Sequence, residues 1–379
     1  MAFGALAVAG TGLKVFFAHS AGLDDYDIQF FLRVGDLMRN DLLGVYAGDG
    51  WVYPPAYLPW VFVATSGTAD DAIGFNYVLR FPLWLVDICI AWLVQDFLRR
   101  HGADEAKRLV AAGCVLIGPM FVAISGHHGQ FDSVVILPAV AALWVWDRGG
   151  ESRALLAGIL IGVAASLKPT PFFLLVALLP WAKSRAEIAR LVIPALAIPL
   201  LLLAPFLIAH AGDTVEGLRE NRGFPGLNGV SLPVSLYWDN IFGTDPTRAL
   251  DFLTDAQQPI VALTVAAIAV LLWRHRLPPA QGAALVWLGV LAATPHLAWQ
   301  YPIWGLPFFL MGGYVRAVAI AQLVAIVPLL IFYRGEQATG FLLHGLYFPF
   351  AFGLYVAVVV AFVLIVRKTL ATRTPQPTG

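Results

Sequence analysis

The residues with the clearest chemical potential follow the first apolar stretch, where Asp24, Asp25 and Asp27 place three carboxylates within four positions. Carboxylates are costly near a bilayer, so such a group in a hydrophobic chain indicates a functional site. A partly desolvated Asp can accept the proton of a sugar hydroxyl as a general base. The alternative is a helix cap, since acidic residues are favoured at a helix start. We expect at least one of the three to be only a cap.

A second polar stretch interrupts the apolar sequence at His127, His128, Gln130 and Asp132. These side chains suit hydrogen bonding to a phosphate or a sugar, and an ordinary interfacial turn is the alternative. Imidazole and carboxylate groups also bind metals, but the spacing matches no strict metal signature. No metal ligand and no cofactor is therefore predicted, although the sequence leaves a divalent cation open.

Further polar residues could complete such a site. Lys168 lies beside a proline that breaks an apolar run, a position suited to a phosphate contact or to snorkelling towards the interface. Arg219 and Arg222 lie in a later polar stretch and are either phosphate contacts or solvated charges. His296 and Gln300 follow another apolar run. We expect these segments to converge on one face of the membrane.

Arg80 and Asp87 have a different interpretation. They are seven residues apart on one expected helix, hence on one face. We expect them to serve packing or a partner helix rather than chemistry.

Composition identifies the class of protein. Of the 379 residues, 59% are hydrophobic and 13% are charged, whereas soluble domains carry roughly 25% charged residues. The formal net charge of +0 gives no field that would recruit nucleic acid. The chain is predicted to be an all-α, polytopic membrane protein with about twelve spans. The expected spans are 3–18, 77–98, 107–124, 131–147, 153–167, 170–182, 191–210, 258–274, 280–295, 299–313, 315–333 and 343–366.

The distribution of basic residues predicts the orientation. With a cytoplasmic N-terminus, fifteen of the 24 Lys and Arg residues fall on the cytoplasmic side, as the positive-inside rule requires. Both termini are then cytoplasmic, and two long loops, 19–76 and 211–257, are external. Within the first loop we expect an interfacial helix over 24–43 and a short, proline-broken segment over 51–66.

Several of these motifs together resemble the GT-C superfamily of integral-membrane glycosyltransferases. Asp25-Tyr26-Asp27-Ile28-Gln29, followed by Tyr53-Pro54-Pro55, is similar to the first-loop motif of dolichyl-phosphate-glucose glucosyltransferases, GPI mannosyltransferases and bacterial polyprenyl-phosphate-mannose mannosyltransferases. His128-Gly129-Gln130-Phe131-Asp132 and Ser166-Leu167-Lys168-Pro169 resemble two later family motifs. The family's late histidine falls near His296 or Gln300.

The resemblance implies a GT-C-type helical bundle in which 1–379 form a single domain. It implies a lipid-monophosphate sugar donor, inversion at the anomeric carbon and Asp25 as the catalytic base. Asp27 occupies the second acidic position, and Tyr53 joins the residues that bind the donor. The glucosyltransferase branch has an acid before its Tyr-Pro-Pro, where this chain has Val52, so the resemblance leaves the hexose open.

The sequence thus predicts an inverting hexosyltransferase that moves mannose or glucose from a polyprenyl-phosphate donor to an external glycan, glycolipid or protein. Its expected partners are this donor, the acceptor and membrane lipids, without nucleic acid. No glycine-rich phosphate loop is present in the sequence to indicate a nucleotide donor. Two alternatives are a secondary transporter, which would place its site near the midplane between repeated halves, and a scaffold subunit without catalysis.

Overall fold

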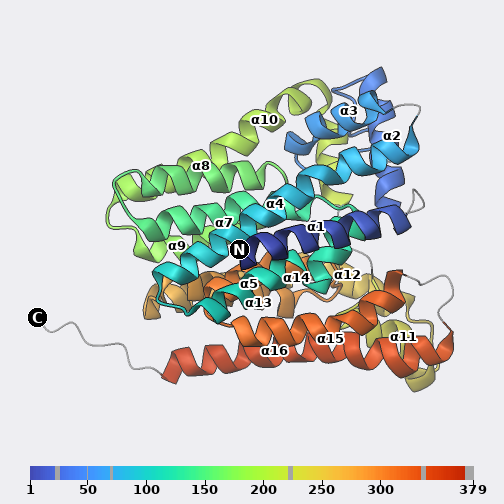
Figure 1. Ribbon diagram of the computed structural model, residues 1–379. Coiled ribbons are helices and arrows are strands. Elements are labelled where there is room, and N and C mark those ends of the chain that lie inside the picture. The colour runs from blue at the N-terminus through green and yellow to red at the C-terminus, as the bar shows by residue number, and fades with distance from the viewer. Residues whose placement is uncertain (22–25, 49, 69–70, 221–224, 334–338, 372–379) are drawn as a thin grey trace, which may run out of the picture. The chain divides into compact units, whose positions relative to one another are not determined.

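The computed structural model shows a helical protein (Figure 1). It describes residues 1–379 apart from 22–25, 49, 69–70, 221–224, 334–338 and 372–379. The described residues form helices of several kinds and no strand. The predicted all-α fold is therefore confirmed.

The chain divides into two compact units. Unit 1 comprises 1–175 and 182–222, and unit 2 comprises 176–181 and 223–379. The prediction of a single domain stays a prediction.

Unit 1 contains most of the predicted site residues. Its α-helices are α1 (Ala2–Ala21), α2 (Tyr26–Asn40), α3 (Leu58–Gly67), α4 (Ala72–Arg100), α5 (Glu105–Leu116), α6 (Pro119–Phe121), α7 (Asp132–Arg148), α8 (Arg153–Ala165) and α10 (Arg185–Glu220), and α9 (Phe173–Leu178) begins in it. Its other helical turns are the 3-10 helices η1 (Pro55–Tyr57) and η3 (Thr170–Phe172) and the π-helix η2 (Val122–His128).

The first helix docks through a narrow stripe. The buried residues of α1 are Gly10, Lys14 and Ala18, at the four-residue spacing that follows one helical face. Gly10 lies so close to α5 that an added Cβ would come within 2.3 Å of the Leu116 carbonyl oxygen. Lys14 Nζ lies 2.6 Å from the Asp87 carboxylate of α4, with both side chains buried. Small residues and one ion pair thus set the register of α1.

Helical segments form within the predicted first loop, and their location at a membrane interface stays a prediction. Within the expected helix over 24–43, the structure has α2, which buries Ile28 and Phe31. Gly35 of α2 approaches the Thr65 side chain of α3 so closely that an added Cβ would come within 2.4 Å of it. The prolines over 51–66 give an extended turn, then η1 and α3. The close packing of α2 on α3 fixes the position of the first turn of α2, which carries Asp27.

The long helix α10 is broken where its span was expected to end. The backbone is non-helical, with φ −142° and ψ 65°, at His210, which is the last residue of the expected span 191–210, and a second helical segment follows to Glu220. Gly162 of α8 lets α10 approach, since an added Cβ would lie 2.6 Å from the Pro194 carbonyl oxygen. Leu200, Leu201 and Ile208 are exposed along α10. Exposed apolar residues on a long helix are expected where lipid is the solvent.

Unit 2 is built around α13 (Pro279–Ala293), most of which is buried. The surrounding helices are α11 (Ser231–Phe242), α12 (Thr247–His275), α14 (Tyr301–Met311), α15 (Val315–Tyr333), the π-helix η6 (Phe341–Tyr347) and α16 (Phe348–Ala371). The 3-10 helix η4 (Leu179–Trp181) also belongs to it, and Trp181 Nε1 donates to the Leu277 carbonyl at 2.8 Å. The predicted second loop over 211–257 is thus largely helical, with α11 inside it and α12 beginning at Thr247.

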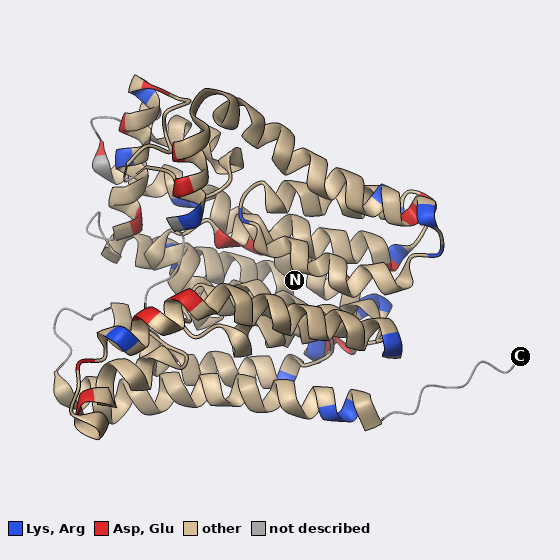
Figure 2. Cartoon of the chain, turned by 180° about the vertical axis from the view of Figure 1, so that it is seen from behind, with Lys and Arg blue, Asp and Glu red and all other residues tan. Residues whose placement is uncertain are grey.

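Seven helices are long and apolar enough to cross a membrane, and four shorter apolar helices accompany them among the described residues. The protein is therefore a polytopic membrane protein, whereas about twelve spans stays a prediction. Within unit 1, Lys and Arg gather at the turns that join α4 to α5 and α7 to α8 and that precede α10 (Figure 2). These turns carry residues that were assigned to the cytoplasmic side by the positive-inside rule.

Candidate functional site

The first turn of α2 aims Asp27 at the polar stretch that follows η2. His128 Nε2 lies 2.7 Å from the Asp27 carboxylate, and Gln130 Nε2 donates to the same oxygen at 2.9 Å. The Gln130 amide also lies 3.5 Å from the Tyr53 hydroxyl. We call Asp27, Tyr53, His128 and Gln130 the Asp27 cluster. It joins residues that are separated by up to 103 positions.

The π-helix η2 determines how His128 and Gln130 are presented. The Gly129 amide donates to the Ile124 carbonyl at 2.8 Å, which closes the wide turn. Gly129 then reverses the chain with φ 75°, a conformation that favours glycine because a Cβ is strained there. One wide turn thus directs the residues before and after Gly129 to the same carboxylate. Single π-turns of this kind are frequent at functional sites.

Aromatic rings enclose the cluster. The Phe131 ring stacks on the Tyr57 ring with centroids 4.3 Å apart and on the Trp51 ring at 5.9 Å. The Tyr46 hydroxyl donates to the Tyr53 carbonyl at 2.8 Å, and this fixes the Tyr-Pro-Pro turn. The low polarity of such rings strengthens electrostatic contacts beside them.

A second ion pair lies next to the cluster. Lys168 Nζ donates to the Asp132 carboxylate at 2.7 Å, and both side chains are buried. The same ammonium lies 4.6 Å from the Tyr53 ring centroid and 4.8 Å from that of Phe131, as cation–π contacts. Lys168 follows α8 and Asp132 begins α7, so this pair joins the ends of two neighbouring helices.

Asp27 is held in its charged form. Burial alone would raise the pKa of the Asp27 carboxyl, but the His128 charge, hydrogen bonds from His128 and Gln130, and the Lys168 charge outweigh burial, so its pKa is lowered. Burial raises the pKa of the nearby Tyr57 phenol. The site therefore contains an ionised carboxylate whose oxygen already accepts two contacts.

The structure brings most of the predicted residues of unit 1 together. The Asp27 cluster and the Lys168–Asp132 pair adjoin through Tyr53. His127 contributes its carbonyl, which accepts a hydrogen bond from Arg80 Nη2 at 2.5 Å. Arg219 lies in the last turn of α10 and is exposed. The predicted Asp25 and Arg222 lie outside the described residues.

Two predicted residues belong to unit 2. His296 is buried, and its Nε2 lies 2.8 Å from the Thr254 hydroxyl of α12. Desolvation lowers the pKa of His296, which favours the neutral imidazole. Gln300 is half-buried at the start of α14. Their role at the site stays a prediction.

Arg80 contacts the site more closely than the sequence indicated. The expectation that Asp87 serves a partner helix is confirmed by its ion pair with Lys14 of α1. Arg80 lies on the same face of α4 as Asp87, but it contacts the backbone of η2 instead. An arginine inside an apolar run was the available signal, but the sequence alone could not show which backbone it contacts.

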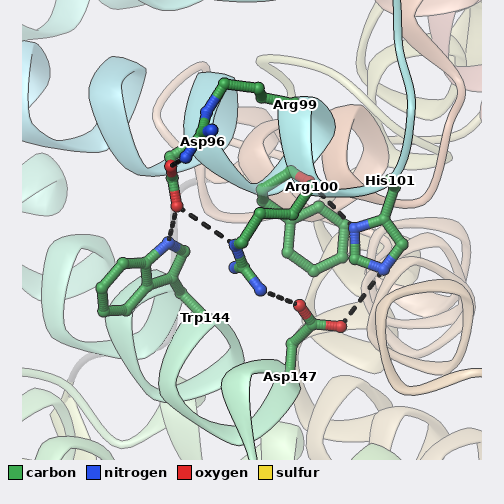
Figure 3. Close-up of polar contacts among 7 residues, drawn as sticks. Asp96, Arg99, Arg100, His101, Trp144 and Asp147 are labelled. Carbon is green, nitrogen blue, oxygen red and sulfur yellow. Dashed lines mark hydrogen bonds and ion pairs between the residues drawn. The ribbon is translucent and has the colours of Figure 1, made fainter.

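A different polar cluster lies at the far end of α4 (Figure 3). The Asp96 carboxylate accepts from Trp144 Nε1 at 2.9 Å and from Arg100 Nε at 3.1 Å. Asp147 lies between Arg100, at 2.5 Å, and His101, at 3.2 Å. We call these residues, with Arg99, the Asp96 cluster. All of its members were absent from the predicted site.

Metal ligation has no structural support in the part of the chain described. No group of three or more His, Cys, Asp or Glu residues is arranged there to hold an ion. The part that is not described includes Asp25.

Part of the chain is similar in sequence to known glycosyltransferases. GPI mannosyltransferase 1 of Gibberella zeae is 29% identical over 136 residues, which cover 36% of this chain and 29% of that protein. GPI mannosyltransferase 1 of Emericella nidulans is 30% identical over 138 residues, with the same shares of each chain. The matched stretch thus covers less than a third of these relatives.

A family match covers more of the chain. The family described as Glycosyltransferase family 87 matches residues 51–295, which include Tyr53, the residues after η2 and Lys168. This range is more than half of the chain, so the alternatives of a transporter or a scaffold without catalysis are set aside. The protein is an integral-membrane glycosyltransferase, and the chain belongs to glycosyltransferase family 87, a GT-C-type family.

Proposed function

We propose that this glycosyltransferase is an inverting hexosyltransferase that uses a polyprenyl-phosphate sugar as donor. The hexose is mannose or glucose, and the similarity to the fungal GPI mannosyltransferases favours mannose. The acceptor is an external glycan, glycolipid or protein. The observation that carries the proposal is the buried group of polar side chains around Asp27, which five segments of a hydrophobic chain contribute.

The proposed reaction needs few protein groups. The acceptor oxygen attacks the anomeric carbon, and the bond from that carbon to the phosphate oxygen breaks. The bonding electrons leave with the phosphate, which is the head of the released polyprenyl phosphate. A phosphate leaving group carries this charge well. Its departure therefore depends more on hydrogen-bond donors and cations in the protein than on a general acid. The remaining need is a base for the acceptor proton.

The electrostatics of Asp27 argue against this residue as the base. A carboxylate with a lowered pKa is a weaker proton acceptor, and the Asp27 carboxylate is already engaged by His128 and Gln130. Asp25, two positions earlier, is the proposed base. Asp27 then orients His128, whose imidazole contacts the donor phosphate.

Lys168 is the second proposed phosphate contact. An ammonium has three donors, so its bond to Asp132 is compatible with a further contact to a phosphate oxygen. Arg219, Arg222 and His127 are proposed to contact the sugar or the donor phosphate, and the role of His296 and Gln300 stays a prediction. Both termini are proposed to be cytoplasmic, with the site on the opposite face.

The test is transfer by the purified protein. Radiolabelled polyprenyl-phosphate mannose and, separately, polyprenyl-phosphate glucose are incubated with the protein and a membrane lipid extract. Labelled product from one donor is expected. Absence of transfer from both donors, by protein that is folded and monodisperse, would contradict the proposal.

The matched variants are Asp25→Asn and Asp24→Asn, which remove adjacent carboxylates. Loss of a general base lowers the rate by about 10²–10⁴-fold, so Asp25→Asn is expected to lose transfer while it still binds the donor. Asp24→Asn is expected to stay near wild type. Near-normal turnover of Asp25→Asn would remove that residue from the role of base.

A further inference from the structure

One face of α4 contacts both α1 and the π-helix η2, and the end of η2 carries the partners of Asp27. Asn76, Arg80, Trp84 and Asp87 recur at helical spacing on this face. The Asn76 amide donates to the Ala18 carbonyl of α1 at 2.8 Å, and Asp87 pairs with α1 as described above. Arg80 and Trp84 instead contact η2. The same face therefore addresses two different elements.

Arg80 binds the end of the π-helix. Its side chain is fully buried, and Nη2 donates to the carbonyl of His127, next to the last residue of η2, at 2.5 Å. The last carbonyls of a helix lack partners within it, and a cation at that end is favourable. Trp84 Nε1 donates to the Ser125 carbonyl at 3.0 Å, two residues earlier. Two α4 side chains thus hold the backbone of η2.

The guanidinium also packs against the turn itself. A Cβ added to Gly129 would lie 3.0 Å from Arg80 Cζ and 2.9 Å from Ile28 Cδ1. Arg80 therefore touches the backbone between His128 and Gln130, and Ile28 is the residue next to Asp27. The Arg80 guanidinium therefore packs against Gly129, the residue between His128 and Gln130, which are the two partners of Asp27.

The burial of Arg80 needs such a function to explain it. Removing a guanidinium from water is costly inside a membrane protein, and apolar packing often stabilises a fold as well as a buried charge does. Apolar packing would not supply a donor to the His127 carbonyl. What the arginine adds is a fixed position for the end of η2.

We propose that Arg80 is a positioning residue for sugar transfer, because it caps η2 and packs against Gly129 so that His128 and Gln130 stay on Asp27. The inference rests on the proposed function for its kinetic consequence. Arg80 acts through His128 and touches neither the donor nor the acceptor. Its effect is therefore expected to be much smaller when His128 is absent, because only Gln130 then depends on the position of η2.

A double-mutant cycle tests this dependence. Arg80→Met keeps a long apolar side chain but removes the donors. A small displacement of an active-site group can cost about 100-fold in rate, so kcat should fall to that extent while KM for polyprenyl-phosphate mannose is unchanged. In a His128→Gln background, Arg80→Met should cause a much smaller further loss. Arg80→Lys, which restores one donor, should recover part of kcat.

Asn76→Ala is the matched control, because Asn76 is buried one turn away on the same face and its side chain contacts α1. It should lower thermal stability and leave kcat within about twofold of wild type, since independent sites contribute additively. Losses for Arg80→Met that are equal in both backgrounds would overturn the positioning role, because they would indicate a general structural defect.

Hydrogen exchange gives a readout that does not require turnover. In Arg80→Met, amides of 122–131 should exchange faster than in wild type, while amides of α5 should be unchanged. Unchanged exchange over 122–131 would overturn the inference even if the protein transfers no sugar. Conversely, absence of transfer by wild type together with faster exchange in Arg80→Met would contradict the proposed function and leave the cap in place.

Discussion

The Asp27 cluster and the Asp96 cluster each pair a carboxylate with a histidine, but they differ in the exposure of the histidine and in assembly. The side chain of His128 is 16% exposed and that of His101 is 49% exposed, whereas Asp27 and Asp96 are alike, at 13% and 12%. The Asp27 cluster combines α2, the turn at Tyr53 and the end of η2. The Asp96 cluster combines the last turns of only two helices, α4 and α7.

This difference distinguishes a site from an anchor. Basic side chains near the ends of spanning helices, packed on Trp, are typical of a membrane interface, and Arg148 lies 4.3 Å from the Trp144 ring centroid. The Asp96 cluster therefore needs no substrate to explain it. Polar groups buried among aromatic rings do need an explanation, because ordinary interfacial anchoring would leave them exposed.

The largest expected effect is on the buried pair Lys168–Asp132. Removing one partner of a buried ion pair costs about 3–5 kcal/mol, whereas replacing both by apolar residues is often neutral. Lys168→Met should therefore lower the free energy of unfolding in detergent by that amount. Lys168→Met with Asp132→Leu should recover most of it.

Activity sharpens this prediction. If Lys168 contacts the donor phosphate, the double variant should be stable but should bind polyprenyl-phosphate mannose more weakly. Stability and donor binding that recover together would assign the pair to folding alone.

The next effect compares two carboxylates. Asp27→Asn weakens the contact with His128, and loss of one preorganised electrostatic contact costs about 10²–10³-fold in kcat. Asp96→Asn makes the same change in the Asp96 cluster and should leave kcat within about twofold. Initial rates with a saturating donor measure both, and a similar loss in the two variants would remove the distinction between the clusters.

A smaller effect is the acid dependence of stability. Because the pKa of Asp27 is lowered in the folded state, its contribution is fully present above the unfolded pKa of about 3.9. The contribution is lost as pH falls through the lower folded pKa. Thermal unfolding of wild type between about pH 5 and pH 2 should therefore show a component that is absent in Asp27→Asn. Parallel curves for the two proteins would contradict the assigned shift.

The smallest effect is expected at Asp147, which pairs with Arg100 and His101 in a partly exposed position. Exposed ion pairs contribute about 0–1 kcal/mol and weaken in salt. Asp147→Asn should lower the free energy of unfolding within that range at low salt, and less at 1 M salt. A loss of several kcal/mol would show that this cluster is a core element of the fold.

Sequence reasoning found the parts of the site that depend on residue type. The helix after the acidic stretch, the turn at Tyr53 and the polar residues from His127 to Asp132 were predicted, because polar groups in an apolar chain stand out. Asp87 was expected to serve packing or a partner helix, and its ion pair with Lys14 of α1 confirms this.

The remaining features depend on packing. The π-turn at Gly129 and the direction of Arg80 follow from backbone geometry, for which the local sequence carries no periodic signal. The end of the span at 210 matches the break in α10 at His210, whereas the helical segment that follows to Glu220 and the helices within 211–257 were missed because a polar stretch carries no hydrophobic run to mark a helix. Lys168 was identified, but its partner Asp132, 36 positions away, was not predicted to bind it.

The most direct test compares the same substitution at two histidines, His128→Gln in the Asp27 cluster and His101→Gln in the Asp96 cluster. Turnover of labelled polyprenyl-phosphate mannose should fall about 100-fold or more in His128→Gln and should stay near wild type in His101→Gln. If both variants turn over alike, the buried cluster is not where the sugar is transferred.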